Sequence, residues 1–206
     1  MPQMDPAHDL LLLIDIQNDF CPGGALAVTD GDAVVPLANR LSHRFSHVAL
    51  TQDWHPAGHF SFASSHAGAT PFSVIAADHG PQTLWPDHCV QGTDGAAFHP
   101  DLDTDAAEVI IRKGCRPTLD SYSAFFENDG STPTGLAGYV RDRGFSHVVM
   151  AGLATDFCVA WSALDARRLG LDVSLVLPAC RAIDQDGSLD AAMAEMTAAG
   201  VVLSQA

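Results

Sequence analysis

Three polar side chains in this sequence, Asp15, Lys113 and Cys158, each follow an apolar run and could together cleave an amide bond. A cysteine nucleophile needs a base that takes its thiol proton and later an acid that protonates the departing amine, and one carboxylate can do both. An ammonium group beside them would favour the thiolate. Cys158 also lies near the start of a helix-like segment, whose N-terminus favours an anion, so we expect a lowered thiol pKa. The alternative is an inert buried cysteine beside an unrelated, solvated Lys–Asp pair.

A second group of residues has the donor atoms of a metal site. Asp53-Trp-His55 places a carboxylate and an imidazole two residues apart, and both point the same way if the segment is extended. Such ligands suit Zn²⁺, Mn²⁺ or Fe²⁺, and a third protein ligand with open positions would make the site catalytic. His59 and His88 are further candidates. We assign the remaining histidines to ordinary surface positions: His8, His43, His47, His66, His79, His99 and His147.

Apolar runs that alternate with helix-like segments predict the elements that must position these groups. The predicted strands are residues 10–16, 47–51, 108–113, 147–150 and 172–177, with a short last strand at 201–203. The predicted helices are 32–46, 135–143, 156–169 and 189–199, and 121–127 is a turn or short helix. Residues 56–99 have little periodicity and many Gly, Pro, His and Ser, which indicates packed functional loops. This alternation predicts an α/β fold: a three-layer sandwich with a central, mainly parallel β-sheet.

The candidate residues share one position in this scheme. Asp15, Asp53 and Lys113 lie at the carboxyl ends of predicted strands, and the segment leading to Cys158 follows another. Open α/β sheets bind their ligands at these strand ends. We therefore expect both candidate groups to meet at one edge of the sheet.

Composition limits the protein class. The 206 residues, of which 47% are hydrophobic, suit one domain over 1–206, with residues 1–9 as a short N-terminal extension. The net charge of −15 opposes binding to nucleic acid or anionic membranes and suits a small substrate. Five cysteines without a Cys-x-x-Cys pair predict reduced thiols, and no segment predicts a membrane span or signal peptide, so we expect a cytoplasmic monomer or small homo-oligomer. Cys21, Cys89, Cys115 and Cys180 are interpreted as structural.

Six segments, in order along the chain, resemble the nicotinamidases, also called pyrazinamidases, of the isochorismatase-like cysteine hydrolase superfamily. These segments are Leu13-Ile-Asp-Ile-Gln-Asn-Asp-Phe20, Asp53-Trp-His-Pro56, Trp85-Pro-Asp-His-Cys-Val-Gln-Gly92, Lys113-Gly114, Asp120-Ser-Tyr-Ser-Ala-Phe125 and Gly152-Leu-Ala-Thr-Asp-Phe-Cys-Val159. The resemblance implies the isochorismatase-like hydrolase fold. It also implies Asp15 as proton acceptor and donor, Lys113 as its electrostatic partner and Cys158 as the nucleophile. A cis peptide before Ala154 is implied as well, with the N–H groups of Ala154 and Cys158 forming an oxyanion hole.

The same resemblance implies a metal site and a ring pocket. Asp53, His55 and His88 would hold one divalent ion, with zinc as the first choice and iron or manganese as alternatives. His59 is left open, as a ligand, a group behind the ligands or neither. Phe20, Trp85 and Tyr122 would form the walls of the ring pocket, and the alternative for these three is ordinary core packing.

The function implied is hydrolysis of nicotinamide, and also of pyrazinamide, to the acid and ammonia through a cysteine thioester. This reaction would belong to NAD salvage or to the cleavage of prodrug-like amides. One alternative is a related amidase that acts on a carbamoyl or ureido substrate. A second is a binding module that senses a pyridine without catalysis. The intact set of Asp15, Lys113 and Cys158 favours an enzyme over the binding module.

Overall fold

A six-stranded parallel sheet forms the centre of the molecule in the computed structural model, which describes residues 4–205. Its strands lie in the order β5-β2-β1-β6-β7-β8, and every neighbouring pair is parallel. Their bounds are β1 Leu10–Ile14, β2 His47–Asp53, β5 Val109–Lys113, β6 His147–Leu153, β7 Asp172–Arg181 and β8 Val202–Ser204. The predicted parallel sheet is confirmed.

The central strand β1 explains why the core forms here. It reads Leu-Leu-Leu-Leu-Ile, and all five side chains are buried. A parallel strand covered on both faces needs such a continuous apolar run. Leu12 lies opposite Ala49 of β2 on one side and Met150 of β6 on the other, so three apolar strands share one register.

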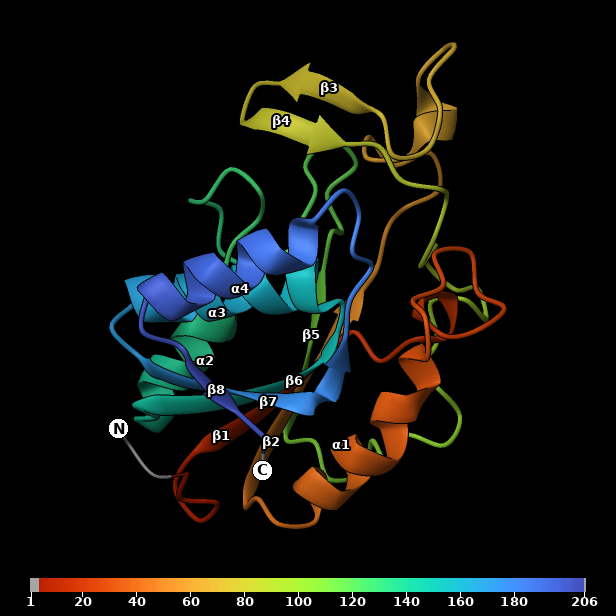
Figure 1. The fold of residues 1–206 in the computed structure, drawn as a ribbon. Coiled ribbons are helices and arrows are strands. Elements are labelled where there is room, and N and C mark those ends of the chain that lie inside the picture. The colour runs from red at the N-terminus through yellow and green to blue at the C-terminus, as the bar shows by residue number, and fades with distance from the viewer. Residues whose placement is uncertain (1–3, 206) are drawn as a thin grey trace.

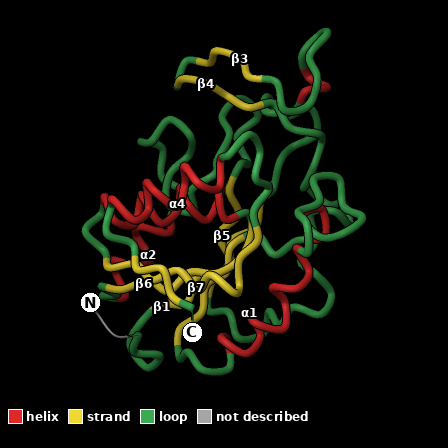
Figure 2. The backbone as a smooth tube through the Cα atoms, viewed as in Figure 1, coloured by secondary structure: helices red, strands yellow, loops and turns green. Residues whose placement is uncertain are grey.

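Helices cover both faces of the sheet and complete the predicted three-layer sandwich. Helix α1 (Val35–Ser42) lies on one face, while α2 (Leu136–Arg143), α3 (Ala160–Arg168) and α4 (Ser188–Ala198) lie on the other (Figures 1 and 2). The direction of the connections explains this arrangement. Right-handed crossovers that move in opposite directions along a sheet place their helices on opposite faces. The chain moves from β1 to β2 in one direction and from β5 onwards in the other.

That reversal of direction lies between β1 and β6, which are neighbours in the sheet. In open parallel sheets, such a switch point leaves a crevice at the carboxyl ends of the strands, and ligands bind there. Asp15 directly follows β1, and the segment to Cys158 directly follows β6. The topology therefore brings the two predicted reacting groups to the crevice.

The structure differs from the sequence predictions in several connections. The predicted helix 32–46 is a 3₁₀ turn followed by the shorter α1, and the predicted helix 156–169 begins with a π-helical turn, Thr155–Val159. Residues 121–127 form no helix. Within the predicted loops 56–99, β3 (Val74–Ala77) and β4 (Gly80–Thr83) form an antiparallel pair that projects from the body (Figure 1). Its strands are short, and their sequences, Val-Ile-Ala-Ala and Gly-Pro-Gln-Thr, lack the apolar–polar alternation that predicts a strand.

One histidine needs correction, and its partner lies at the end of the predicted N-terminal extension. Residues 1–3 of that extension lie outside the described residues, and its last residue, Asp9, contacts the core. Asp9 Oδ2 lies 2.8 Å from His147 Nδ1, whose other ring nitrogen is 2.9 Å from the Ser174 hydroxyl. His147 is therefore buried, and its assignment to the surface is wrong. Within residues 4–205, no helix is long and apolar enough to cross a membrane.

Gly152 allows β1 and β6 to approach each other at the crevice, and we expect Gly152→Ala to destabilise the fold. Its φ is +127°, and an added Cβ would lie 2.1 Å from the backbone oxygen of Ile14. Overpacking of this kind, added to an unfavourable φ, predicts a loss of about 3 kcal/mol in the free energy of unfolding, measured by urea denaturation. Gly144→Ala is the control, because Gly144 also has positive φ but its Cβ would meet no atom within 4 Å. It should cost about 1–2 kcal/mol. Equal losses in the two variants would contradict the close approach.

Candidate active site

The ammonium group of Lys113 is the centre of a buried charge cluster at the ends of β1, β2 and β5. Nζ lies 2.8 Å from Asp15 Oδ2, 3.0 Å from Asp53 Oδ1 and 3.4 Å from Cys158 Sγ. It also donates a hydrogen bond to the backbone oxygen of Ser121 at 2.9 Å. Although burial alone would lower it, the two carboxylates hold the pKa of Lys113 well above its usual value. The structure therefore brings Asp15, Lys113 and Cys158 together, as predicted.

Asp15 has the environment of a general base. Its side chain is fully buried, and Oδ1 accepts a hydrogen bond from the Thr51 hydroxyl at 2.6 Å. Burial raises the pKa of Asp15, although the Lys113 ammonium and the Thr51 hydroxyl oppose this rise. A carboxylate with a raised pKa is a stronger base than a solvated one. Apart from its ion pair with Lys113, Oδ2 has no hydrogen-bond partner, so it can accept a proton.

Cys158 occupies the π-helical turn that follows β6, and its resting state differs from the sequence prediction. Burial raises the pKa of the Cys158 thiol, and the Asp15 and Asp53 carboxylates raise it further, whereas Lys113 lowers it. The predicted lowering of this pKa is therefore wrong, because the helix N-terminus and one cation do not offset burial beside two carboxylates. The resting site holds a thiol. Cys158 Sγ and Asp15 Oδ2 both contact Lys113 Nζ, at 3.4 and 2.8 Å, so the thiol lies beside the carboxylate that could accept its proton.

The backbone before this turn contains the implied cis peptide. The bond between Leu153 and Ala154 is cis, and the carbonyl oxygen of Ala154 accepts hydrogen bonds from the N–H groups of Phe157 and Val159. Ala154 and Cys158 both line the same cavity. The use of their N–H groups as an oxyanion hole stays a prediction.

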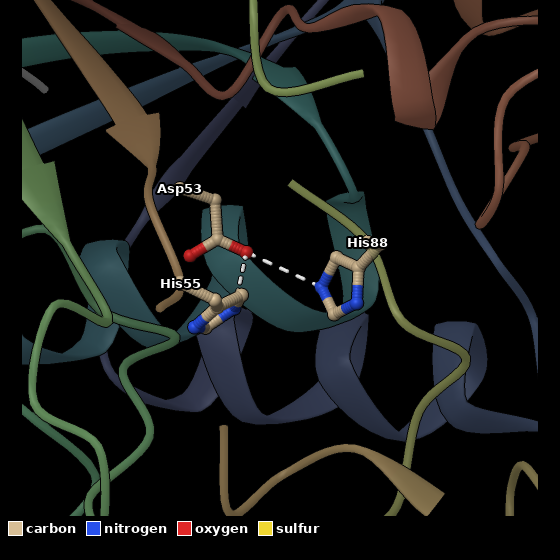
Figure 3. A group of neighbouring side chains, drawn as sticks. All are labelled: Asp53, His55 and His88. Carbon is tan, nitrogen blue, oxygen red and sulfur yellow. Dashed lines mark hydrogen bonds and ion pairs between the residues drawn. The ribbon is translucent and has the colours of Figure 1, made fainter. Parts of the chain in front are cut away.

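Asp53, His55 and His88 converge beside this cluster (Figure 3). Asp53 Oδ2 lies 3.0 Å from His55 Nε2 and 3.3 Å from His88 Nε2, and all three side chains are buried. Nδ1 of His55 lies 3.0 Å from the Gly114 carbonyl, and Nδ1 of His88 lies 2.8 Å from the Pro86 carbonyl. A carbonyl only accepts hydrogen bonds, so each Nδ1 carries a proton, and in the neutral ring Nε2 offers a lone pair. A bound cation would satisfy three acceptors that face one another in this way.

The donor set therefore fits a divalent metal ion. Two imidazole nitrogens and a carboxylate oxygen within 4.8 Å of one another match the ligands of catalytic zinc, iron or manganese sites. Hydrogen bonds from the far ring nitrogens to backbone carbonyls orient such ligands in known metal sites. The predicted set is brought together by the end of β2, which holds Asp53, by the segment after it, which holds His55, and by the segment after β4, which holds His88.

His59, which the sequence left open, already uses both ring nitrogens. Nε2 lies 2.8 Å from the carbonyl of Arg116, so it is the donor, while Nδ1 accepts the N–H of Ser61 at 3.2 Å. With no lone pair free, His59 cannot be a ligand in this arrangement, although it belongs to a possible second group with His55 and Asp120. The centroid of its ring lies 4.3 Å from that of His55, so His59 packs against a candidate metal ligand.

Asp120 is a candidate residue that the sequence reasoning placed in a motif without a role. It is buried, lines the cavity, and its Oδ1 lies 3.9 Å from His55 Nε2. The Gln82 amide donates to its Oδ2 at 2.8 Å. A second carboxylate therefore faces the metal candidates, and its signal in the sequence is its place between the Lys113 and Tyr122 segments.

An aromatic cavity connects the thiol and the metal candidates. All three predicted wall residues line it. Trp85 Nε1 donates to the Tyr122 hydroxyl at 3.0 Å, and Phe20 packs edge-on against His88 with ring centroids 5.6 Å apart. The sequence reasoning missed three further apolar wall residues: Leu26, Phe157 and Ile183.

Comparisons with known proteins agree with this geometry. Residues 9–206 match the family model of the isochorismatase domain. The nicotinamidase of Acinetobacter baylyi is 53% identical over 93% of this chain and 89% of its own length. The nicotinamidase of Escherichia coli is 47% identical over 94% of this chain and 92% of its own length.

Solved structures show the same fold. The nicotinamidase/pyrazinamidase of Acinetobacter baumanii superposes with a TM-score of 0.95 and 50% identity, covering 99% of this chain and 98% of that one. The pyrazinamidase of Pyrococcus horikoshii, solved in complex with zinc, gives a TM-score of 0.78 and 34% identity over 97% of this chain and 99% of that one.

The different hydrogen bonding of His88 and His59 predicts different effects on metal binding. His88→Ala removes a free Nε2 and should weaken zinc binding by at least about 100-fold, measured by chelator competition with metal-free protein. His59→Ala should keep one zinc per chain and weaken binding by less than about tenfold. His99→Ala, outside the cavity, is the control. If His59→Ala lost zinc as completely as His88→Ala, His59 would be a ligand and the tautomer argument would be wrong.

Proposed function

The chain belongs to the isochorismatase family, and from its nicotinamidase relatives we propose that it hydrolyses nicotinamide to nicotinate and ammonia through a thioester on Cys158. The relatives support the reaction class, which is hydrolysis of an amide C–N bond. The observation that carries the proposed mechanism is the contact of one ammonium group, Lys113 Nζ, with both Asp15 and Cys158. This contact supports the proposal, because the proposed base and the proposed nucleophile both touch one buried ammonium group.

The first half of the reaction forms the thioester. Asp15 Oδ2 takes the proton of Cys158 Sγ as the sulfur bonds to the carboxamide carbon, and the N–H groups of Ala154 and Cys158 stabilise the oxyanion. Asp15 then gives this proton to the amide nitrogen, the C–N bond breaks and ammonia leaves. Lys113 stays protonated throughout, because the carboxylates hold its pKa well above its usual value.

The second half regenerates the thiol. Asp15, again a carboxylate, takes a proton from a water molecule, whose oxygen attacks the thioester carbon. The C–S bond breaks, the sulfur leaves as a thiolate, and Asp15 returns the proton to it. Because Asp15 has a raised pKa and Lys113 remains charged beside it, one carboxylate serves as base and acid in both halves.

Asp53, His55 and His88 would hold one divalent ion, and the relative solved with zinc supports zinc as the first choice, with iron or manganese as alternatives. When bound, this ion supplies a Lewis acid for the ring nitrogen of the substrate. Phe20, Trp85 and Tyr122 would pack against the ring and exclude water. Pyrazinamide, a similar amide, would bind in the same pocket. We place this enzyme in the cytoplasm and in NAD salvage as part of the proposal.

Cys158→Ala tests the nucleophile. We expect ammonia release from nicotinamide to fall by at least about 10⁴-fold, because the covalent step is lost while the pocket keeps its walls. Calorimetry should still detect nicotinamide binding to this variant. Cys115→Ala is the matched control, because Cys115 is exposed and its thiol donates only a long hydrogen bond, 3.8 Å, to the backbone carbonyl of Lys113. Turnover by Cys158→Ala at the rate of Cys115→Ala would refute the thioester.

The pH profile of kcat/KM tests Asp15 as the base. Activity should fall as the pH decreases through the raised pKa of Asp15, because protonation removes the acceptor. The Thr51 hydroxyl stabilises the charged carboxylate and so lowers this pKa. Thr51→Val should therefore move the acid limb to higher pH, and Thr51→Ser should restore it. An acid limb that stays in place in Thr51→Val would assign it to another group, such as a metal ligand.

A further inference from the structure

Asp156, two residues before Cys158, joins the turn of the nucleophile to a distant loop. Its carboxylate is buried, with Oδ1 accepting the N–H of Ile183 at 3.0 Å and Oδ2 accepting the N–H of Asp184 at 2.8 Å. Oδ2 also accepts the Ser188 hydroxyl at 2.5 Å. Neither the family motifs nor the mechanism above gives this carboxylate a role.

The loop held in this way forms part of the cavity wall. Residues 182–187 connect β7 to α4, and Ile183 lines the cavity with Phe157 and Trp85. The N–H of Gln185 donates to the Ser188 hydroxyl at 2.9 Å, which in turn donates to Asp156, so the carboxylate orders the loop at both ends.

The loop has a conformation that needs such support. Asp184 and Asp186 have φ values of +53° and +52°, in the left-handed region that side chains rarely adopt. Residues in this region persist only where the surrounding structure holds them. Asp184 and Asp186 are both exposed, so burial of their side chains does not supply this hold.

We propose that Asp156 is a positioning residue that holds the Ile183 loop against the ring of the substrate and so sets substrate affinity. The proposal rests on the function proposed above, because it takes the cavity as the ring pocket. Asp156 acts through Ile183, and it neither touches the reacting atoms nor moves a proton.

The geometry requires a carboxylate at this position. Each oxygen of Asp156 accepts at least one backbone N–H, so both must be acceptors. In Asp156→Asn one of these oxygens becomes an NH₂ donor facing another donor. The opposed N–H then loses its partner in a buried place, and the loop is released at that point. Asp156→Asn therefore removes a hydrogen bond to the loop while it hardly changes the size of the side chain.

Release of the loop should change KM and not kcat. Contact between Ile183 and the ring is the same in the ground state and the transition state, and loss of such uniform binding raises KM alone. For Asp156→Asn we expect KM for nicotinamide to rise about tenfold, with kcat changed by less than about threefold. Asp186→Asn is the matched control, because it makes the same change on an exposed residue of the same loop, and it should leave both constants unchanged.

A double-mutant cycle shows whether the effect passes through Ile183. Ile183→Ala should raise KM by a similar factor. In the double variant that also carries Asp156→Asn, KM should be at most about twofold higher than in the single variant with the higher KM. Ser188→Ala, which removes only the hydroxyl, should show a smaller rise in KM and serves as the milder variant if Asp156→Asn folds poorly. Additive effects in the cycle would overturn the proposal.

Two further measurements separate this inference from the proposed function. Asp156→Asn should speed amide hydrogen exchange in a peptide covering residues 182–188, and in the Cys158→Ala background it should weaken nicotinamide binding about tenfold. Wild-type protein that does not hydrolyse nicotinamide would refute the proposed function. If the wild-type protein hydrolyses nicotinamide but Asp156→Asn has unchanged KM and unchanged hydrogen exchange, only the positioning role of Asp156 would be refuted. A fall in kcat at constant KM in Asp156→Asn would refute that role as well.

Discussion

A single buried cation, the ammonium of Lys113, is the interaction on which the rest of the site depends. It is enclosed by Asp15 Oδ2, Asp53 Oδ1 and Cys158 Sγ, and its side chain has no exposed surface. Removing an ammonium ion from water costs several kcal/mol, and only well-placed partners offset that cost. Asp15 and Asp53 supply these partners. The same contacts join the reacting half of the site to the metal half, because Asp53 faces Lys113 with one oxygen and the two imidazoles with the other.

The sheet must bring the ends of several strands together to build this cluster, and two glycines remove the obstacles. Gly152 lets β6 approach β1, where any Cβ would meet the Ile14 backbone. Gly114, next to Lys113, has a φ of +64°, and its Cβ would lie 2.4 Å from Cε1 of the His55 ring. That missing side chain lets the Gly114 carbonyl accept from His55 Nδ1, which fixes the ligand's orientation. The packing of the backbone and the tautomer of a candidate metal ligand therefore have one cause.

The sequence predicts much of this arrangement because strand ends are marked by simple patterns. The run Leu10–Ile14 before Asp15 indicates a buried parallel strand, and the topology rules for such sheets then bring Asp15 and Cys158 to one crevice. Such patterns do not predict properties that depend on the three-dimensional surroundings of a side chain. The thiol pKa was predicted with the wrong sign because burial among Asp15 and Asp53 cannot be seen in the order of residues. His147 has the same explanation, since its partners are Asp9 and Ser174.

The raised thiol pKa has a consequence for how the site works. A permanent thiolate would add a negative charge beside Asp15 in a buried place where Lys113 already balances that carboxylate, so burial keeps the proton on sulfur at rest. Attack on a carbonyl carbon moves the new negative charge from sulfur to the oxyanion, away from the two carboxylates. The proton then needs to leave sulfur only when an amide is in place to accept that charge. In the proposed mechanism, a buried thiol with an adjacent carboxylate of raised pKa would therefore tie activation of the nucleophile to substrate binding and would protect the free enzyme from the reactivity of an exposed thiolate.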